Sequence, residues 1–243
     1  MHLVQLTDIH IGREGENTRG VDVRANFLQA LERIANLQPD QLVLSGDLCY
    51  MDGEAGIYAW IRSQLASLGL PFSAIPGNHD SSALLAEGLG LGDHLKDGEL
   101  YYRHSWGEWL VLFLDSARGS LSAGQKHWLA RQLYSHGAHP VLVFIHHPPC
   151  LAGVPYMDKR YALQDRDEVL AILDEHASPV ELFCGHYHVE KSLRIGTVGI
   201  HLTPSTFFQI DMHEEAFAID HYRIGFREIW LEDERLLSTM WWG

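Results

Sequence analysis

The sequence predicts an α/β protein in which two packed β-sheets are flanked by helices. Short runs rich in Val, Leu, Ile and Phe alternate with longer amphipathic stretches, as in βαβ units around a mostly parallel sheet. After residue 190 the pattern changes to short strands separated by Gly, Pro and Asp, which favours an antiparallel meander that closes a second sheet. We find no repeat, low-complexity tract or linker, so we expect residues 1–243 to form a single domain.

The first strands are expected where short runs are apolar almost throughout. Strands that are covered on both faces need no alternation with polar residues, and each of these runs ends in polar residues. The predicted strands are Leu3–Thr7, Gln41–Ser45, Pro71–Ile75, Trp109–Asp115, Val141–Ile145 and Val180–Cys184.

Helices are expected between these strands. Apolar residues such as Phe27, Leu31 and Ile34 are spaced for one face of a helix over Val21–Leu37, and the Gln-Pro pair that follows ends it. The same spacing predicts helices at Ile57–Leu68, Ala123–Tyr134 and Arg166–His176. The short strands of the meander are expected at Ser192–Ile195, Val198–Leu202, Ala216–His221 and Phe226–Leu231.

The composition limits which partners the chain can bind. A formal net charge of -14 repels polyanions, so we expect no long nucleic acid, whereas a small anionic substrate can bind where cations sit locally. Cys49, Cys150 and Cys184 are too few for a disulfide framework, and their odd number fits a reducing compartment. With no signal-peptide pattern and no run of about 18 apolar residues, we expect a cytoplasmic protein without a membrane span.

Five polar clusters follow the apolar strands. In open α/β sheets the carboxyl ends of the strands form the ligand-binding edge, so clusters that are far apart in the sequence should converge there. The clusters are Asp8-Ile9-His10, Gly46-Asp47, Gly77-Asn78-His79-Asp80, His146-His147-Pro148-Pro149 and Gly185-His186-Tyr187-His188. We therefore expect one site built from five loops.

The residue types in these clusters indicate metal binding. They supply imidazole, carboxylate and amide oxygen without thiolate, a set suited to Mn, Fe, Co and Zn. In an extended segment residues i and i+2 face the same way, so Asp8 pairs with His10, and His186 with His188. Each cluster alone has an ordinary structural explanation as a turn or a strand end. All five in this order are improbable as a coincidence.

The order D-x-H, G-D, G-N-H-[DE], H and G-H-x-H resembles the signature of the calcineurin-like metallophosphoesterase family, and the chain matches it from Asp8 to His188. The resemblance implies a metallophosphatase-type αββα sandwich and a metal-dependent phosphoric diester hydrolase. It also implies two divalent metal ions (Mn, Fe, Zn or Co) bridged by Asp47. The other ligands would be Asp8, His10 and His188 for one ion, and Asn78, His146 and His186 for the other.

The same resemblance implies roles beside the metals. His79 would hydrogen-bond a phosphoryl oxygen and help the leaving oxygen depart, with Asp80 orienting its ring. His147 would either support a ligand, face the substrate or pack at the strand end. Two divalent ions, two carboxylates and a bridging hydroxide leave about one net positive charge, which suits a singly charged phosphodiester.

A closer resemblance, to the bacterial class III cyclic nucleotide phosphodiesterases, extends beyond the signature. It rests on Met157-Asp158, Ala162-Leu163-Gln164, Thr203-Pro204-Ser205-Thr206, Gln209 and Gly225-Phe226-Arg227. This resemblance implies that the bridging hydroxide attacks a 3',5'-cyclic nucleotide, most simply cyclic AMP, to give the 5'-monophosphate. Loops 153–164 and 204–209 would then contact the nucleoside, although they could equally be ordinary loops.

Other functions remain open at the level of sequence. The site chemistry is indifferent to what the phosphate carries, so a glycerophosphodiester, an aryl phosphodiester or a lipid-linked pyrophosphate is an alternative small-molecule substrate. A non-catalytic metal-binding scaffold is a further alternative. Loss of ligands would mark such a scaffold, and here the ligand set is complete.

Overall fold

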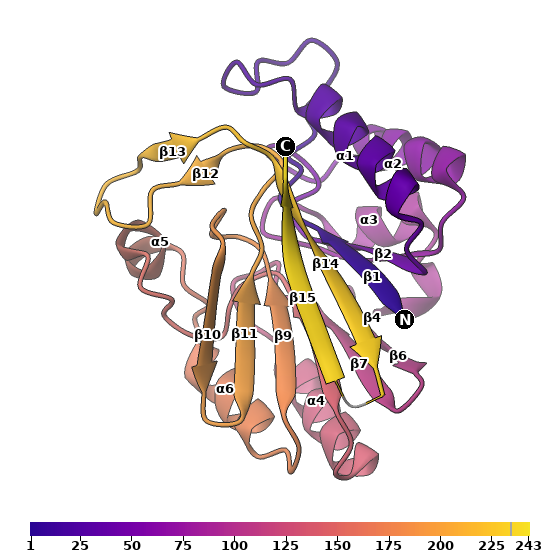
Figure 1. Cartoon of the computed structure of the whole chain (residues 1–243), viewed down its shortest axis with the longest axis vertical. Helices are drawn as coiled ribbons and strands as arrows, with labels where there is room; N and C mark the ends of the chain where they lie inside the picture. Colours follow the sequence, from indigo (N-terminus) through magenta and orange to yellow (C-terminus); the bar gives the residue numbers. More distant parts are fainter. Residues whose placement is uncertain (234) are drawn as a thin grey trace.

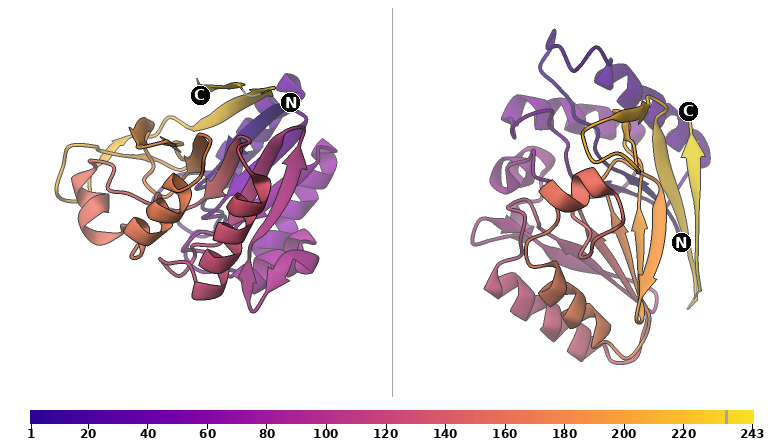
Figure 2. Two further views of the ribbon diagram at one scale, coloured as in Figure 1. Left: turned by 90° about the horizontal axis from the view of Figure 1, so that it is seen from below. Right: turned by 90° about the vertical axis from the view of Figure 1, so that its left-hand side faces the viewer.

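The computed structural model describes residues 1–233 and 235–243 and contains two mixed β-sheets stacked face to face, with helices on the outer sides (Figures 1 and 2). This arrangement confirms the predicted fold class, an α/β sandwich of two mixed sheets flanked by helices. Of the helices that the structure describes, none combines the length and hydrophobicity that crossing a membrane requires.

The first sheet has the strand order β15-β14-β1-β2-β3. The strands β1, β2 and β3 run parallel, and β14 and β15 extend the sheet antiparallel to β1. Their bounds are β1 His2–Leu6, β2 Gln41–Ser45, β3 Phe72–Ile75, β14 Gly225–Glu232 and β15 Arg235–Trp242.

The second sheet has the strand order β10-β11-β9-β8-β7-β6. Its four central strands are parallel, and the edge strands β6 and β10 are antiparallel to their neighbours. The bounds are β6 Tyr102–Trp106, β7 Trp109–Leu114, β8 Val141–Ile145, β9 Val180–Cys184, β10 Lys191–Ile195 and β11 Val198–Leu202.

Helices α1, α2 and α3 lie on the side of the first sheet, and α4 and α6 on the side of the second (Figure 1). Asp22, Ser81 and Ser122 begin α1, α3 and α4 by accepting a hydrogen bond from a backbone N–H of the first turn. The helices are α1 Val23–Leu37, α2 Ala55–Leu68, α3 Ser82–Leu89, α4 Ala123–His136, α5 Pro155–Arg160, α6 Arg166–Asp174 and the 3₁₀ turn η1 Gly92–His94. Two short hairpins, β4 Leu95–Lys96 with β5 Glu99–Leu100 and β12 Gln209–Ile210 with β13 Ile219–His221, complete the fold.

The predicted antiparallel meander after residue 190 is wrong. The late strands are divided among three sheets: β10 and β11 extend the second sheet, β12 and β13 form a separate hairpin, and β14 joins the first sheet beside β1. Local alternation identifies a short strand but not its partner, which depends on which sheet edge lies nearby. The elements that were not predicted are the strands β4, β5, β6, β12 and β15, the helices α3 and α5 and the turn η1.

A row of aromatic side chains crosses the second sheet on the face toward the first. Tyr102, Phe113, Phe144, Phe183 and His201 occupy in-register positions on β6, β7, β8, β9 and β11. Their neighbouring ring centroids are 4.6 to 5.9 Å apart, and the Tyr102 hydroxyl donates to the Ala74 carbonyl of β3 at 2.9 Å. The row therefore packs the two sheets together.

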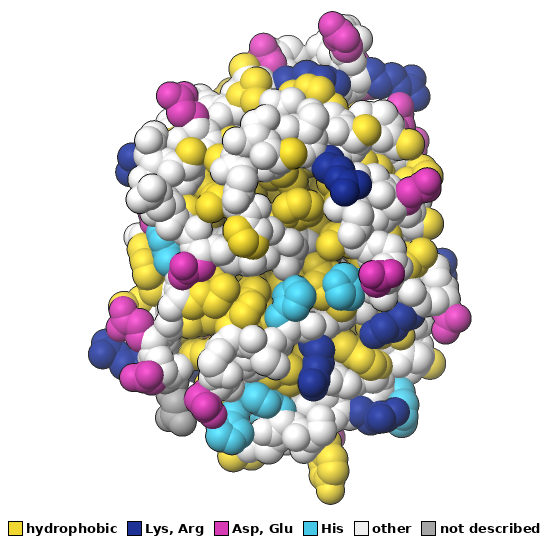
Figure 3. Space-filling view, turned by 90° about the vertical axis from the view of Figure 1, so that its right-hand side faces the viewer, with side chains coloured by type: hydrophobic (Ala, Val, Ile, Leu, Met, Phe, Trp, Pro, Cys, Tyr) yellow, Lys and Arg dark blue, Asp and Glu magenta, His cyan; other side chains and the backbone are white. Residues whose placement is uncertain are grey.

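Charges of both signs are mixed on the face of the molecule drawn in Figure 3, where apolar side chains lie mainly in hollows between polar ones. No single-sign field covers this face. With a formal net charge of -14, the protein must attract an anionic ligand locally, within a site.

Candidate metal centre

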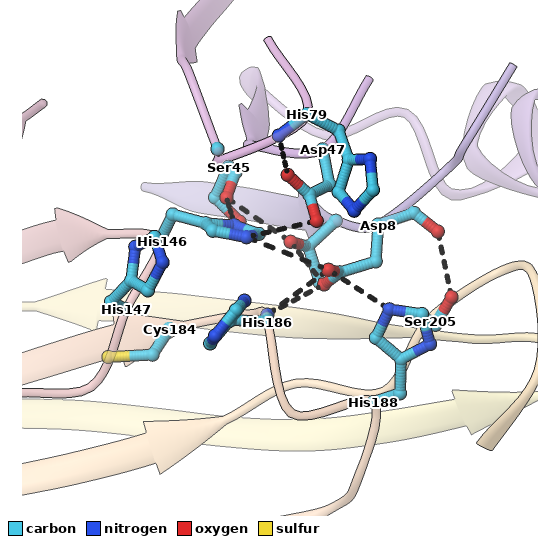
Figure 4. A network of polar contacts seen from close by, with 12 residues as sticks. Asp8, Ser45, Asp47, His79, His146, His147, Cys184, His186, His188 and Ser205 are labelled. Atoms are coloured by element: carbon cyan, nitrogen blue, oxygen red, sulfur yellow. Dashed lines mark hydrogen bonds and ion pairs between the residues drawn. The ribbon is translucent and has the colours of Figure 1, made fainter. Parts of the chain in front are cut away.

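The five polar clusters meet at one edge of the sandwich, at the carboxyl ends of strands from both sheets (Figure 4). Possible ligand atoms of Asp8, His10 and His188 lie within 4.8 Å of one another, as do those of Asp47, His146 and His186. These two groups match the two halves of the ligand set implied by the sequence. Asn78 lies on the wall of the same cavity as Asp47.

The loops that carry these residues adopt left-handed backbone conformations. The φ angles are 53° at Asp8, 44° at His10, 51° at Asp47, 68° at His186 and 50° at His188. For residues other than glycine this conformation costs about 1–2 kcal/mol each, so the surrounding structure must hold it.

Two glycines allow the loops to approach each other. A side chain at position 77 would collide with the Asp47 carboxylate, and one at position 185 would collide with Thr7 and the Asp8 carboxylate. Neither glycine has a positive φ, so close approach, and not backbone freedom, requires glycine at both positions.

The buried carboxylates are held ionised. Burial opposes ionisation of Asp8, but the nearby His188 and His146 lower its pKa to about 2. Asp47 is affected in the same direction, chiefly by His146, whose Nε2 lies 3.3 Å from Oδ2 of Asp47. Burial lowers the pKa of His10 to about 3 and that of His186 to about 4, so both rings are neutral, as metal ligands must be.

The pKa of His146 shifts in the opposite direction. Burial lowers it, but the attraction of Asp47 and Asp8 is larger and raises the pKa to about 9. The two carboxylates therefore draw positive charge to the position between them. A divalent cation supplies that charge more fully than one imidazolium ring.

The histidine rings are oriented as metal-binding rings are. His146 Nδ1 donates to the Ser45 carbonyl at 2.9 Å, His186 Nε2 to the Tyr161 carbonyl at 3.0 Å and His188 Nδ1 to the Phe208 carbonyl at 2.9 Å. Because a carbonyl only accepts, the other nitrogen of each ring has a free lone pair when the ring is neutral. For His146 this requires that a cation take the place of its proton between the two carboxylates.

Two imidazole nitrogens at the centre, His146 Nε2 and His10 Nδ1, are buried and have no hydrogen-bond partner among the described residues. His10 Nε2 and His188 Nε2 lie 3.1 Å apart and can share one proton. Buried polar atoms are rarely left in this way unless an ion or water completes them. The residues present therefore fit divalent metal ions.

His79 lies beside the metal centre with its ring held by backbone. Its backbone N–H donates to Asp47 Oδ1 at 2.9 Å, and its Nδ1 donates to the Met51 carbonyl at 2.8 Å. The Nε2 atom is then the ring nitrogen that remains available to a bound molecule. A carboxylate oxygen of Asp47 and a nitrogen of His10 lie within 4.8 Å of a His79 nitrogen, so proximity alone does not separate His79 from the ligands.

The structure corrects the role expected of Asp80. The contact that orients the His79 ring comes from Met51, and the Asp80 carboxylate accepts instead from Gly77 N–H, Leu48 N–H and the Tyr58 hydroxyl at 2.9 to 3.1 Å. Burial, followed by the charge of Asp47, raises the pKa of Asp80 to about 6. Asp80 thus holds the loops that carry Asp47 and Asn78.

His147 packs behind the centre. Its ring lies 4.0 Å from that of His186, centroid to centroid, and Ser116 Oγ is 2.8 Å from its Nδ1. The side chain is buried and is absent from the described lining of the cavity. Of the three roles left open by the sequence, the structure favours support of a neighbouring ligand.

A support behind His186 was missed in the sequence. Tyr187, between the two histidines of its cluster, is fully buried and donates its hydroxyl to Asp158 Oδ1 at 2.9 Å. Asp158 also accepts the backbone N–H groups of Ala152, Gly153 and Val154. Helix α5 is thereby attached to the G-H-Y-H loop. The signals in the sequence were the position of Tyr187 between two candidate ligands and the presence of Asp158 in the segment that resembles the cyclic nucleotide phosphodiesterases.

Five of the candidate metal ligands, His10, Asp47, Asn78, His186 and His188, line the floor of a cavity of about 440 Å³. Its remaining walls are largely aromatic and come from loops that are distant in the sequence. They include Tyr50, Tyr156, Tyr161, Phe207, Phe208 and Phe217, together with Arg19. Tyr156 and Tyr161 fall in the loop 153–164 and Phe207 and Phe208 in the loop 204–209, the two segments whose role the sequence left open. No sequence pattern indicated Arg19 or Phe217.

Comparisons with known proteins agree with this geometry. A family model described as calcineurin-like phosphoesterase matches residues 1–190. A dimetal phosphatase from Danio rerio superposes with a TM-score of 0.68 at 15% sequence identity, covering 99% of this chain and 98% of that chain, which shows a shared fold.

Three curated relatives are similar over most of their length. A probable cyclic nucleotide phosphodiesterase from Fibrobacter succinogenes is 36% identical, covering 88% of this chain and 83% of the relative. The 3',5'-cyclic adenosine monophosphate phosphodiesterase CpdA from Escherichia coli is 30% identical, covering 98% and 88%. The glycerophosphodiester phosphodiesterase GpdQ from Enterobacter lignolyticus is 31% identical, covering 88% and 81%.

Proposed function

Since the chain belongs to the calcineurin-like phosphoesterase family, a family of metal-dependent phosphoesterases, we propose that it hydrolyses a 3',5'-cyclic nucleotide, most simply cyclic AMP, to the 5'-monophosphate. The observation that carries the proposal is the His and Asp cluster at the floor of the aromatic cavity. The floor suits a phosphodiester, and the cavity is larger than a glycerol group needs. The buried thiols of Cys49, Cys150 and Cys184 fit the cytoplasmic location expected from the sequence.

The proposed ligand assignment follows the two groups of neighbouring side chains. Asp47 would be the ligand shared by the two ions, because its Oδ2 is 3.7 Å from His10 Nε2 and 3.3 Å from His146 Nε2. Asp8, His10 and His188 would complete one ion, and Asn78, His146 and His186 the other. When bound, two divalent ions supply an activated water and neutralise the phosphoryl charge.

The protein orients the candidate ligand rings, and His79 supplies a proton. The carbonyls of Ser45, Tyr161 and Phe208 fix three ligand rings, so the phosphoryl group meets a preformed floor. When the His79 ring is protonated, Nδ1–H donates to the Met51 carbonyl, and Nε2–H can hydrogen-bond the phosphoryl group and pass its proton to the leaving oxygen, which leaves the ring neutral.

A glycerophosphodiester is the second candidate substrate, because the similarity to GpdQ nearly equals that to CpdA. A non-catalytic scaffold fits the centre poorly. A metal-binding scaffold would use the buried imidazole nitrogens as ligands, but it has no need for the His79 ring that lines the cavity beside them.

The proposal is tested by turnover of cyclic AMP, cyclic GMP and a glycerophosphodiester by protein that has been stripped and reconstituted with Mn, Fe, Zn or Co. We expect the highest kcat/KM for a cyclic nucleotide, and only with metal restored. A value at least about tenfold higher for the glycerophosphodiester would overturn the substrate assignment. No turnover of any diester with any of these metals would overturn the reaction itself.

A further inference from the structure

The cavity above the metal centre has two unlike halves. Its floor is formed by imidazole and carboxylate groups, whereas the rim opposite is formed by aromatic rings and one arginine. The floor accounts for the phosphate. The rim faces whatever the phosphate carries, so its chemistry describes the rest of the substrate.

The rim aromatics form a continuous surface built from separate elements. Phe217, from the loop between β12 and β13, lies with its ring centroid 5.6 Å from that of Tyr156 on α5, and Tyr156 lies 5.6 Å from Tyr161. Tyr161 is 46% exposed and Phe217 37% exposed. Large aromatic side chains left in water at the mouth of a cavity are typical of a ligand-binding surface.

Arg19 completes this surface. Its guanidinium carbon lies 5.1 Å from the centroid of the Phe217 ring, in a cation–π arrangement. Among the described residues that line the cavity, Arg19 is the only lysine or arginine. A guanidinium placed in this way presents N–H donors to the cavity, while its stacked face limits the positions it can take.

The aromatic rings of the rim together with Arg19 favour one class of substrate over the others. Glycerol has no flat face to stack on these rings, and an acyl chain has no acceptor for Arg19. A nucleobase has both a π-face, which stacks on aromatic side chains, and ring nitrogens or carbonyls that accept hydrogen bonds. On the premise of the proposed function, we propose that Arg19, Tyr156, Tyr161 and Phe217 form a nucleobase subsite.

The proposal is tested by calorimetric titration of the metal-reconstituted protein with AMP and with ribose 5-phosphate. The two ligands share the phosphate and sugar, so the ratio of their Kd values isolates the base. Stacking on aromatic side chains predicts that AMP binds roughly 5- to 150-fold more tightly. Equal Kd values would overturn the subsite.

Variants locate the effect. Phe217→Leu should weaken AMP binding about fivefold or more without changing the Kd of ribose 5-phosphate, whereas Tyr222→Leu, at an exposed tyrosine outside the cavity, should change neither. Arg19→Met should likewise affect AMP alone. Its matched control is Arg160→Met, which removes the same charge from an arginine stacked on Tyr156 outside the cavity lining.

The outcomes separate this subsite from the proposed reaction. Loss of both ligands in Arg19→Met would show that Arg19 binds phosphate and would overturn its role toward the base. A large AMP preference in a protein that does not hydrolyse cyclic nucleotides would support the subsite and reject the reaction. Hydrolysis of cyclic nucleotides with no such preference would reject the subsite alone.

Discussion

The two carboxylate oxygens of Asp47 make different contacts. Oδ1 accepts the His79 backbone N–H, while Oδ2 faces the imidazoles of His10 and His146. Asn at this position keeps an acceptor for the backbone N–H but removes the charge. Asp47→Asn should therefore stay folded yet lose metal and more than about nine-tenths of the diesterase activity. Metal analysis and turnover measure both losses.

The Asp47 variant has a simple control. Asp220→Asn removes an equal charge from an exposed position and should leave metal content and activity unchanged. If Asp47→Asn kept two bound ions and most of its turnover, Asp47 would not bridge them.

The role of His79 can be distinguished from that of a metal ligand by measuring how the loss of rate in a His79 variant depends on the leaving group. Because its fold contact to Asp47 is made by backbone, His79→Ala should leave the loop and the metal content intact. General acid assistance is worth about 10²- to 10⁴-fold, so the loss should be of that order on a cyclic nucleotide and distinctly smaller on a p-nitrophenyl diester. Equal losses on the two substrates would indicate phosphoryl binding without proton transfer, and lost metal would make His79 a ligand.

At the scale of elements, helix α5 is coupled to the metal centre. The hydrogen bond from the Tyr187 hydroxyl to the Asp158 carboxylate joins α5 to the G-H-Y-H loop. The Tyr161 carbonyl at the end of α5 accepts a second hydrogen bond, from His186 Nε2. Tyr187→Phe preserves volume but releases one side of this attachment. We expect KM for a cyclic nucleotide to rise about 5- to 10-fold with kcat changed less than about twofold, because the α5 aromatics are displaced more than the ligands.

A purely structural tyrosine provides the comparison. Tyr102→Phe also removes buried hydrogen bonds, to both backbone groups of Ala74, and should lower thermal stability without changing KM. If Tyr187→Phe behaved in the same way as Tyr102→Phe, the attachment would have no role in substrate positioning.

Strands could be predicted from the sequence where both of their faces are buried. The strands β2, β8 and β9 coincide with apolar runs because both of their faces are covered. The edge strand β15 has half-buried and exposed residues in alternation, and helix α5 has only six residues, so neither gives a strong periodic signal. The His and Asp cluster was predictable because each of its members follows a strand, whereas Arg19 and Phe217 meet only through the tertiary arrangement of loops.

For the whole molecule, we expect residues 1–243 to unfold as one unit. The candidate ligands come from both sheets, and the aromatic row and the Tyr102 hydroxyl pack the sheets together. Metal should therefore stabilise both sheets at once, and its removal should lower the Tm of a single transition. Scanning calorimetry with and without chelator measures this. Two separate transitions, with only one of them sensitive to chelator, would show that the sheets belong to independent units.

The left-handed backbone at Asp8, His10, Asp47, His186 and His188 bears on how such a protein would change over generations. Each residue in this conformation costs folding free energy that the surrounding structure must offset. In a lineage that had abandoned the ions, glycine would be favoured at any of these positions, since it adopts the same angles without strain. Substitution by glycine would then remove the candidate ligands one by one. The first sign of a lost activity would be a gain in thermal stability.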